Sequence, residues 1–399
     1  MISFVDIARC PTSNSFIKEL ERNVSYKLVN SYYTTLIINT TVYIFVENTA
    51  SDKPTVTIAI PVLNEEKYIE DVLNSFLNST YSNIIEILIA DGGSIDKTVS
   101  LVTELSKKDS RIKLIDNPEK YQSYALNKMI NNAKGEIFLR ADSHCRYASD
   151  YVEQCVKCIL RTGAANVGGA QNYKAETLIQ SGIAIAVKNF FGNGGAKYMD
   201  ESFEGYADTV FLGCFRTNDL REIGGFSEVN RTNEDAELNL RLKKELKGKI
   251  YVSPLINSWY YPRKSFTKLF TQYFRYGRGR YITNKKHDGD IPYRSKAPFI
   301  FLSFMVLFGL MDFVLEQDFG FIYVSSAILI LVFFESVRFS YEKKDYLKRE
   351  VWTPESTQTP PILILAIMCF LSLLIMNIAH FFGYGWQALK YLFTKENIW

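Results

Sequence analysis

Short apolar runs alternate with amphipathic segments along the chain from about residue 55 onward. Four of these runs predict strands, at 55–62, 84–90, 111–115 and 136–139, and the first of them is rich in β-branched residues. Between them, apolar residues recur at i, i+3 and i+4 spacing, as at Ile69, Val72 and Leu73, and predict helices. Strands and helices that alternate in this way predict an α/β fold with a mostly parallel, Rossmann-like sheet and helices on both of its faces.

The pattern is less regular on either side of this region. Residues 32–46 are rich in Thr, Ile, Val and Tyr and predict one or two strands, but we assign no chemistry to the lead-in formed by residues 1–53. Further along the chain, two apolar runs predict strands at 165–173 and 209–215. A charged amphipathic segment at 234–247 predicts a helix.

Three long apolar runs follow residue 296. They cover 297–315, 320–338 and 360–382, and each reaches the roughly 17–25 residues that cross a hydrocarbon core of about 30 Å. Residues 263–296 contain ten Lys or Arg and two Asp, and the loop 338–349 is also basic. Basic loops favour the cytoplasmic side, so we expect a multi-pass protein of the cell membrane with a cytoplasmic catalytic domain. Three full spans would place the C-terminus outside, whereas an interfacial third segment would keep it inside.

Composition narrows the function classes further. The net charge of +3 is too small to predict nucleic-acid binding. The six cysteines show no disulfide-like framework, and Cys155 and Cys158 lack the second pair that a zinc site would need. The first thirty residues are polar and mixed in charge, which does not fit a signal peptide. We therefore expect reduced, mostly buried thiols in a domain that faces the cytosol.

Polar residues stand where three of the predicted strands end. Asn64 and Glu65 follow the first strand, Asp91 the second and Asp142 the fourth. Because the carboxyl ends of parallel strands meet at one edge of a sheet, we expect these side chains to share a binding crevice. On an extended backbone Asp142 and His144 would point to the same side and could hold a divalent cation against a diphosphate. An ordinary strand-end cap with a solvated histidine is the alternative for this pair.

Two common nucleotide-binding motifs are missing from this edge. The first strand ends in PVLNE (61–65) rather than in the G-x-G-x-x-G turn of a dehydrogenase, and the sequence has no Walker phosphate loop. Five other motifs occur in order: PVLNE, DGGSIDKT (91–98), DSH (142–144), NED (233–235) and QYFRY (272–276). With them, the chain resembles the GT-A nucleotide-sugar glycosyltransferases of family 2 over roughly residues 54–290. It resembles in particular the membrane-anchored, succinoglycan-biosynthesis-type enzymes of bacterial exopolysaccharide.

The resemblance implies a donor site. Asp91 corresponds to the carboxylate that contacts the nucleotide base, and the turn at Asn64 and Glu65 to groups near the base and ribose. Asp142 matches the metal-binding end of the family's DxD motif, with His144 in place of the second Asp, and the two would hold Mg²⁺ or Mn²⁺. Asp96 has an alternative role as a cap of the helix that follows it. The residues expected to bind the nucleotide sugar are Pro61, Asn64, Glu65, Asp91, Gly93, Asp96, Arg140, Asp142, Gln272 and Tyr276.

The resemblance also implies the catalytic groups. Asp235 matches the base that takes the proton of the acceptor hydroxyl, and inversion in a single displacement needs only one base. Glu234 and Asp235 begin the predicted helix, whose dipole favours ionised carboxylates, although both also fit ordinary helix-start acids. Gln272, Arg275 and Tyr276 share one helical face, on which Arg275 can stabilise charge on the leaving diphosphate. Tyr276 stands where the family commonly has Trp.

These residues predict an inverting, metal-dependent hexosyltransferase of family 2. It would move a sugar from a nucleoside-diphosphate sugar, with a UDP-sugar favoured, to a lipid-linked or glycan acceptor at the cytoplasmic face, in contact with membrane lipids. A processive polysaccharide synthase, a polyprenyl-phosphate sugar synthase and a catalytically silent scaffold are the alternatives. The expected division is a lead-in (1–53), a GT-A catalytic domain (54–260), a basic juxtamembrane segment with QYFRY (261–296) and a membrane domain (297–399).

Overall fold

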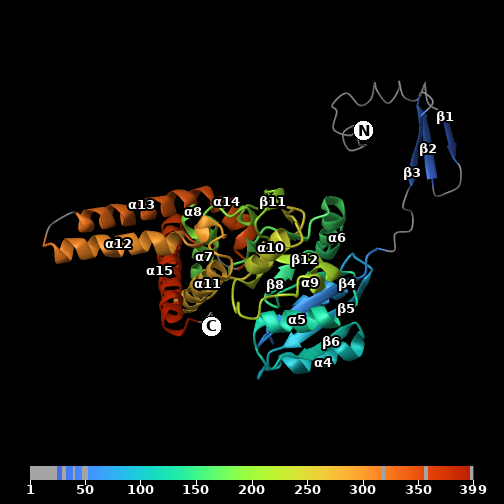
Figure 1. Ribbon diagram of the computed structural model, residues 1–399, viewed down its shortest axis with the longest axis horizontal. Coiled ribbons are helices and arrows are strands. Elements are labelled where there is room, and N and C mark those ends of the chain that lie inside the picture. Colours follow the sequence, from blue (N-terminus) through green and yellow to red (C-terminus); the bar gives the residue numbers. More distant parts are fainter. Residues whose placement is uncertain are drawn as a thin grey trace. The chain divides into compact units, whose positions relative to one another are not determined.

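The computed structural model describes residues 25–28, 33–38, 41–46, 53–316, 320–354, 358–395 and 399. The chain divides into two compact units, Met1–Pro54 and Thr55–Trp399 (Figure 1). In the first unit, β1 (Ser25–Leu28), β2 (Tyr33–Ile38) and β3 (Thr41–Val46) form an antiparallel sheet. The strands predicted at 32–46 are confirmed, and β1 is an additional strand that the sequence pattern did not predict.

The second unit is built around an eight-stranded sheet in the order β11-β13-β9-β12-β7-β4-β5-β6 (Figure 1). Its parallel half contains the four strands predicted from the apolar runs. The elements of this half are β4 (Val56–Val62), α3 (Ile69–Leu77), β5 (Ile84–Asp91), α4 (Thr98–Lys108), β6 (Ile112–Asp116), α5 (Gln122–Asn132) and β7 (Ile137–Arg140). Alternate residues of β4 pack into different cores, Ile58 with α3 and Ala59 with α5. Helices therefore cover both faces of the sheet, as predicted.

The other half of the sheet mixes strand directions. β12 (Phe211–Arg216) runs antiparallel to β7 and to β9 (Asn166–Gly169). β13 (Ile250–Val252) is parallel to β9, and β11 (Gly205–Ala207) is antiparallel to β13 at the edge. The alternation of apolar residues indicates that a strand exists but not its direction, so the reversal of β12 could not be predicted.

A small second sheet corrects one predicted element. It contains β10 (Asn172–Tyr173), β14 (Ser258–Tyr260) and β8 (Cys145–Tyr147). The single strand predicted at 165–173 is wrong, because the chain leaves the large sheet after β9 and joins the small one as β10. The remaining short elements of this region are α6 (Tyr151–Thr162), α7 (Leu178–Lys188), α8 (Phe190–Asn193), the 3₁₀ turn Lys197–Met199, α9 (Thr217–Glu222) and α10 (Glu234–Lys244). The cysteines in the described part of the chain are free and buried.

Three long apolar helices end the chain, as predicted. They are α12 (Ala297–Val314), α13 (Phe321–Glu342) and α15 (Ile362–Thr394), and each is long and apolar enough to cross a membrane. α12 and α13 lie side by side, whereas α15 runs across their base (Figure 1). α11 (Phe266–Lys286) precedes these apolar helices, and the 3₁₀ turn Tyr293–Ser295 follows it. α14 (Lys344–Tyr346) and a π-helical turn (Leu347–Val351) connect α13 to α15.

Helices α11 and α15 meet in backbone contact at two glycines. A Cβ placed on Gly277 of α11 would lie 2.2 Å from the carbonyl oxygen of His380, and one on Gly383 of α15 would lie 2.0 Å from that of Phe274. On the other side of α11, a Cβ placed on Gly279 would lie 2.5 Å from the carbonyl oxygen of Thr232, so there is no room for one. α11 is therefore held between α15 and the segment that leads into α10.

Replacement of Gly383 by alanine is expected to push α11 and α15 apart. Overpacking of this kind costs about 1–3 kcal/mol, which lowers the melting temperature by several degrees. Gly385→Ala is the matched control on the same helix, since its Cβ would meet only a Phe299 ring atom at 3.3 Å. Thermal unfolding of both variants in detergent measures the effect, and equal melting temperatures would contradict the proposed contact.

Candidate active site

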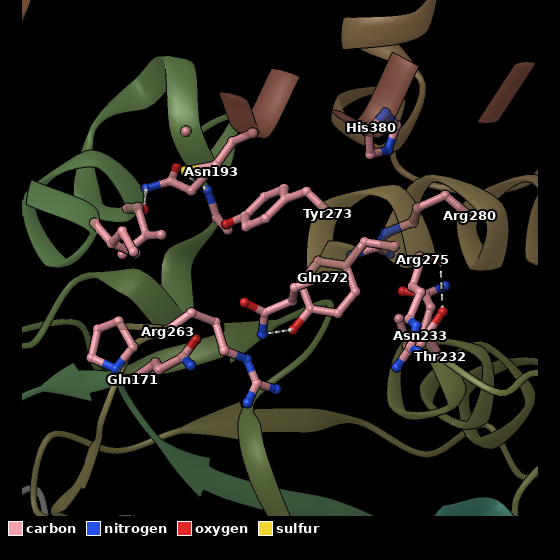
Figure 2. A pocket seen from close by; sticks show the side chains of 18 of the residues that line it. Gln171, Asn193, Thr232, Asn233, Arg263, Gln272, Tyr273, Arg275, Arg280 and His380 are labelled. Carbon is pink, nitrogen blue, oxygen red and sulfur yellow. Dashed lines mark hydrogen bonds between the residues drawn. The ribbon is translucent and has the colours of Figure 1, made fainter. Parts of the chain in front are cut away.

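One cavity of about 1620 Å³ connects the sheet edge to the long apolar helices. Part of its wall comes from the carboxyl ends of the parallel strands, and part from the start of α10 and from α11 (Figure 2). The rest comes from α12, α13 and α15. The volume exceeds the roughly 300–1,000 Å³ of a typical small-molecule site, so the cavity can hold more than one substrate.

The turns after β4 and β5 are tied together at the sheet edge. The Asn64 backbone N–H donates to Ser94 Oγ at 2.8 Å, and Asn64 Oδ1 accepts the Ile95 N–H at 2.9 Å. Asn64 has a positive φ of 57°, a conformation that asparagine tolerates better than most residues. Asn64 therefore orders the turn, while its neighbours Pro61 and Glu65 line the cavity.

Asp91 lies at the end of β5, and its carboxylate is held within its own turn. It accepts the backbone N–H groups of Gly93 and Ser94, each at 3.0 Å, and the Ser94 hydroxyl at 2.5 Å. Gly93 has a φ of +82°, which favours glycine. The side chain of Asp91 is nearly buried beside the cavity and is not part of its lining.

Asp96 is also engaged by the backbone. Its carboxylate accepts the N–H and the hydroxyl of Thr98 and the N–H of Glu66. These bonds fix the start of α4 and join it to the turn after β4. The geometry is that of the alternative interpretation, in which Asp96 stabilises a helix start, and Asp96 does not line the cavity.

Asp142 and His144 both line the cavity, but the backbone between them is not extended. Ser143 and His144 form a turn, because the Tyr147 hydroxyl accepts the Asp142 N–H at 2.7 Å and donates to the Asp142 carbonyl oxygen at 2.9 Å. His144 Nδ1 lies 3.3 Å from Glu65 Oε1. Both residues therefore face the cavity as predicted, but the predicted extended backbone between them is wrong.

Arg140, the last residue of β7, is buried between three carboxylates. Its guanidinium lies 3.6 Å from Asp142 and 3.4 Å from Glu234, and it forms a hydrogen bond with Asp235. A buried charge needs such partners because desolvation is costly. Arg140 thus links the end of β7 to the start of α10.

Glu234 and Asp235 open α10, as the sequence predicted, but their environments differ. The side chain of Glu234 is 7% exposed, and burial raises its pKa although Arg140 acts in the opposite direction. The side chain of Asp235 is 34% exposed and lines the cavity. Asn233 precedes them with a φ of +65° and donates to Thr283 Oγ1 of α11 at 2.9 Å. Asp235 is therefore the accessible carboxylate of the pair.

Gln272, Arg275 and Tyr276 lie on α11 and line the cavity together. Figure 2 shows Gln272 and Arg275 on this wall. Gln272 Nε2 donates to the Tyr276 hydroxyl at 3.0 Å, as expected for residues four apart on one helical face. The Thr232 hydroxyl donates to the Arg275 carbonyl oxygen at 2.9 Å, which joins the motif to the segment before α10.

Sequence reasoning missed one group of residues on the cavity wall. The segment after β6 contributes Asn117, Lys120, Tyr121 and Gln122, and Gln122 Nε2 donates to Asp142 Oδ1 at 3.2 Å. The guanidinium of Arg231 stacks over the Tyr121 ring at 3.8 Å. β6 was predicted, so its polar carboxyl end was an available signal that could have added this segment to the site.

Comparison with known proteins establishes the family. A family model described as glycosyl transferase family 2 matches residues 57–208. The succinoglycan biosynthesis protein ExoA of Rhizobium meliloti (strain 1021) is 35% identical over 254 residues, which cover 62% of this chain and 77% of that protein. This chain is a family 2 glycosyltransferase. The resemblance inferred from the five motifs is confirmed, and so is the α/β GT-A fold followed by apolar helices.

Other relatives of this glycosyltransferase are also transferases. A Methanococcus voltae protein named dolichyl N-acetyl-alpha-D-glucosaminyl phosphate 3-beta-D-2,3-diacetamido-2,3-dideoxy-beta-D-glucuronosyltransferase is 32% identical over 271 residues, covering 65% of this chain and 83% of that protein. Among solved structures, the mannosyltransferase PcManGT from Pyrobaculum calidifontis, in complex with GDP-Man and Mn²⁺, aligns with 87% of this chain and 89% of its own. That alignment has a TM-score of 0.49 and 15% sequence identity.

Proposed function

We propose that this glycosyltransferase moves a sugar, with inversion, from a nucleoside-diphosphate sugar to a lipid-linked or saccharide acceptor at the cytoplasmic membrane face. Its place would be in exopolysaccharide or other cell-surface glycan synthesis, in keeping with the names of its relatives. The observation that carries the proposal is the Arg140 bridge. It brings Asp142 at the sheet edge and Asp235 at the start of α10 to one guanidinium, beside one cavity.

The donor would lie along the carboxyl ends of β4, β5 and β6. Pro61, Glu65 and the segment after β6 line this part of the cavity. Asn64, Asp91, Gly93 and Asp96 would act mainly by shaping the two turns that face the nucleotide, because their polar groups are already engaged. UDP-sugars are the favoured donors.

Asp235 would act as the base. It is exposed to the cavity, lies in the first turn of α10 and can accept the proton of an acceptor hydroxyl as that oxygen attacks the anomeric carbon. Glu234, which is buried, would keep Arg140 in place instead of contacting the acceptor. Arg275 with Gln272 and Tyr276 would bind the leaving diphosphate, whose negative charge the guanidinium stabilises.

The donor groups of Asp142 and His144 fit a divalent cation. Within the described residues, no three His, Cys, Asp or Glu side chains are grouped to hold a metal ion alone, so phosphate oxygens of the nucleotide would complete the coordination. His144 Nδ1 faces the Glu65 carboxylate, an arrangement that leaves Nε2 available as a ligand. A bound Mg²⁺ or Mn²⁺ would neutralise charge on the diphosphate.

Replacement of His144 by alanine is expected to change the metal dependence. If Nε2 is a ligand, the Mn²⁺ concentration needed for half-maximal nucleotide release should rise by about tenfold or more, because the cation loses one of its two protein ligands. The control is His287→Ala, since His287 contacts Glu237 and does not line the cavity. Titrations with Mg²⁺ and Mn²⁺ measure the effect, and an unchanged metal profile would remove His144 from the coordination set.

The membrane arrangement follows from the helices and their flanking charges. α12 and α13 form a hairpin with basic residues before and after it, and such flanking charges favour the cytoplasmic side for both ends of the hairpin. α15 runs across the base of this hairpin (Figure 1). We therefore favour an interfacial α15, with the catalytic region and the end of α15 on the cytoplasmic side.

A donor-hydrolysis assay tests the proposed function. The purified chain in detergent with Mg²⁺ or Mn²⁺ should release nucleotide from at least one UDP-, GDP- or dTDP-sugar. Absence of nucleotide release from all of them would favour a catalytically silent scaffold. Product length then distinguishes single addition from the alternative of a processive synthase, since long polymer from purified protein would rule out single addition. Transfer to a bare polyprenyl phosphate would identify the second alternative, a polyprenyl-phosphate sugar synthase.

A further inference from the structure

The cavity extends beyond Asp235 into an apolar region between the membrane helices. Its walls there come from α12, α13 and α15, and include Phe301, Met305, Ile328, Val332, Leu373 and Met376. A nucleotide sugar has no apolar part of this size. The apolar region therefore fits the acceptor, which is the other substrate of the proposed reaction. Its apolar walls favour an acceptor that carries a hydrocarbon chain.

Arg280 lies on the cavity wall where the polar and apolar regions meet. It is a residue of α11, one turn beyond the QYFRY motif, and burial lowers the pKa of its guanidinium. Among the described residues it forms no ion pair, whereas the neighbouring Arg294 is bonded to Asp208. The side chain of Arg280 is partly buried, and the carboxylate that acts on its charge, Asp208, is already bonded to Arg294. The guanidinium can therefore gain from an anionic ligand on the cavity wall.

His380 of α15 lies on the same wall as Arg280 (Figure 2). Its side chain is 8% exposed, and its Nδ1 has no hydrogen-bond partner in the described part of the chain. Its own backbone lies against Gly277 of α11, so the two helices bring a histidine and an arginine to one place. A polar group buried without a partner in an apolar helix points to a ligand.

We propose that Arg280 and His380 bind the phosphate group of a lipid-linked acceptor, whose hydrocarbon chain lies between α12, α13 and α15. The proposal rests on the transferase function proposed above and assigns its acceptor to the lipid-linked class. Arg280 donates charge-assisted hydrogen bonds to the phosphate oxygens, and the unpartnered ring nitrogen of His380 provides a further donor when it carries a proton. Beyond the phosphate, the acceptor's sugar reaches Asp235 along the same cavity.

Lipid binding without a donor tests the site. The full chain in detergent micelles is titrated with decaprenyl phosphate, and bound lipid is read by native mass spectrometry. We expect Arg280→Gln and His380→Leu each to weaken binding by about tenfold, since hydrogen bonds to charged groups contribute about 1.5–3 kcal/mol. The control is Arg278→Gln on the same helix, because Arg278 bonds Gln387, stacks on Trp399 and does not line the cavity. The Arg278→Gln variant should bind decaprenyl phosphate as tightly as the unaltered chain does.

Two further probes separate the parts of the ligand. Decaprenol, which has the same chain without phosphate, should bind weakly and equally to the unaltered chain and to Arg280→Gln. Inorganic phosphate should not compete at equal concentration. Equal weakening by Arg278→Gln, or full competition by inorganic phosphate, would overturn the proposal. If Arg280→Gln does not fold, Arg280→Lys keeps the charge and should retain most of the binding, and its complete loss would count against the site.

Failure of this proposal is distinguishable from failure of the proposed function. Lipid binding is measured with no donor present, so it can be read even if no nucleotide sugar is turned over. A chain that releases nucleotide but does not bind decaprenyl phosphate more tightly than decaprenol keeps its transferase function and loses the proposed site.

Discussion

Replacement of Asp235 by asparagine is expected to lower the rate of sugar transfer by about 10³-fold while nucleotide binding persists. General bases contribute about 10²–10⁴-fold, and asparagine cannot accept the proton of an acceptor hydroxyl. The fold should survive, because the buried Glu234 and Asp142 remain as partners of Arg140. Steady-state transfer and nucleotide titration on the same preparation measure the two effects separately.

Asp71→Asn provides a matched control for Asp235→Asn. Asp71 is an exposed acid in the first turn of α3, so it shares the residue type and the helix position but does not line the cavity. Its transfer rate should not change. Equal losses of nucleotide binding and transfer in Asp235→Asn would refute its role as the base and would favour a structural role for the carboxylate.

Replacement of Arg140 by methionine is expected to destabilise the protein strongly at neutral pH. Removal of one partner from a buried ion pair costs about 3–5 kcal/mol, because the remaining charges lose their compensation. Because the entropy of unfolding grows with chain length, that cost lowers the melting temperature of the unit Thr55–Trp399 by roughly 4–7 °C. Arg146→Met is the control, since Arg146 is an exposed strand residue over the Tyr261 ring and should change the melting temperature little.

The loss of stability caused by Arg140→Met should become smaller as the pH falls. Burial already raises the pKa of Glu234, and Arg140 is the group that opposes this rise. Without Arg140 the pKa of Glu234 should rise further, because only burial then acts on it strongly. A carboxyl whose pKa is higher in the folded than in the unfolded state penalises folding above its folded pKa, and the penalty disappears below the unfolded pKa. Melting temperatures measured from pH 8 down to about pH 4, just below the pKa of about 4.3 of an unfolded glutamate, should therefore approach those of the unaltered chain, and a constant difference would contradict the role of Glu234.

The site also distinguishes residues that face the cavity from residues that shape it. Asp142, His144, Asp235 and the α11 motif line the cavity, whereas Asp91 and Asp96 have their carboxylates occupied by backbone groups of their own turns. A motif indicates that a residue type belongs at a position but not whether its polar atoms face substrate or backbone. That difference depends on hydrogen bonds within the turn, which the spacing of residues does not reveal.

Local periodicity by itself determined the parallel half of the sheet and the three apolar helices. Each of these elements is stabilised by burial of a face whose spacing is visible in the sequence, as for Ile69, Val72 and Leu73 in α3. The polar ends of β4, β5 and β7 also followed from the sequence, because parallel strands bring their carboxyl ends to one edge. The candidate donor site could be predicted for this reason.

Only the tertiary structure decided how the catalytic groups meet. Arg140 and Asp235 are 95 residues apart, and their contact requires β12 to run antiparallel between β7 and β9 before the chain returns to α10. Likewise, Arg280 and His380 come together because Gly277 and Gly383 allow α11 and α15 to touch. Strand direction and helix crossing depend on packing between distant segments, whereas periodicity reports only which face of each segment is buried.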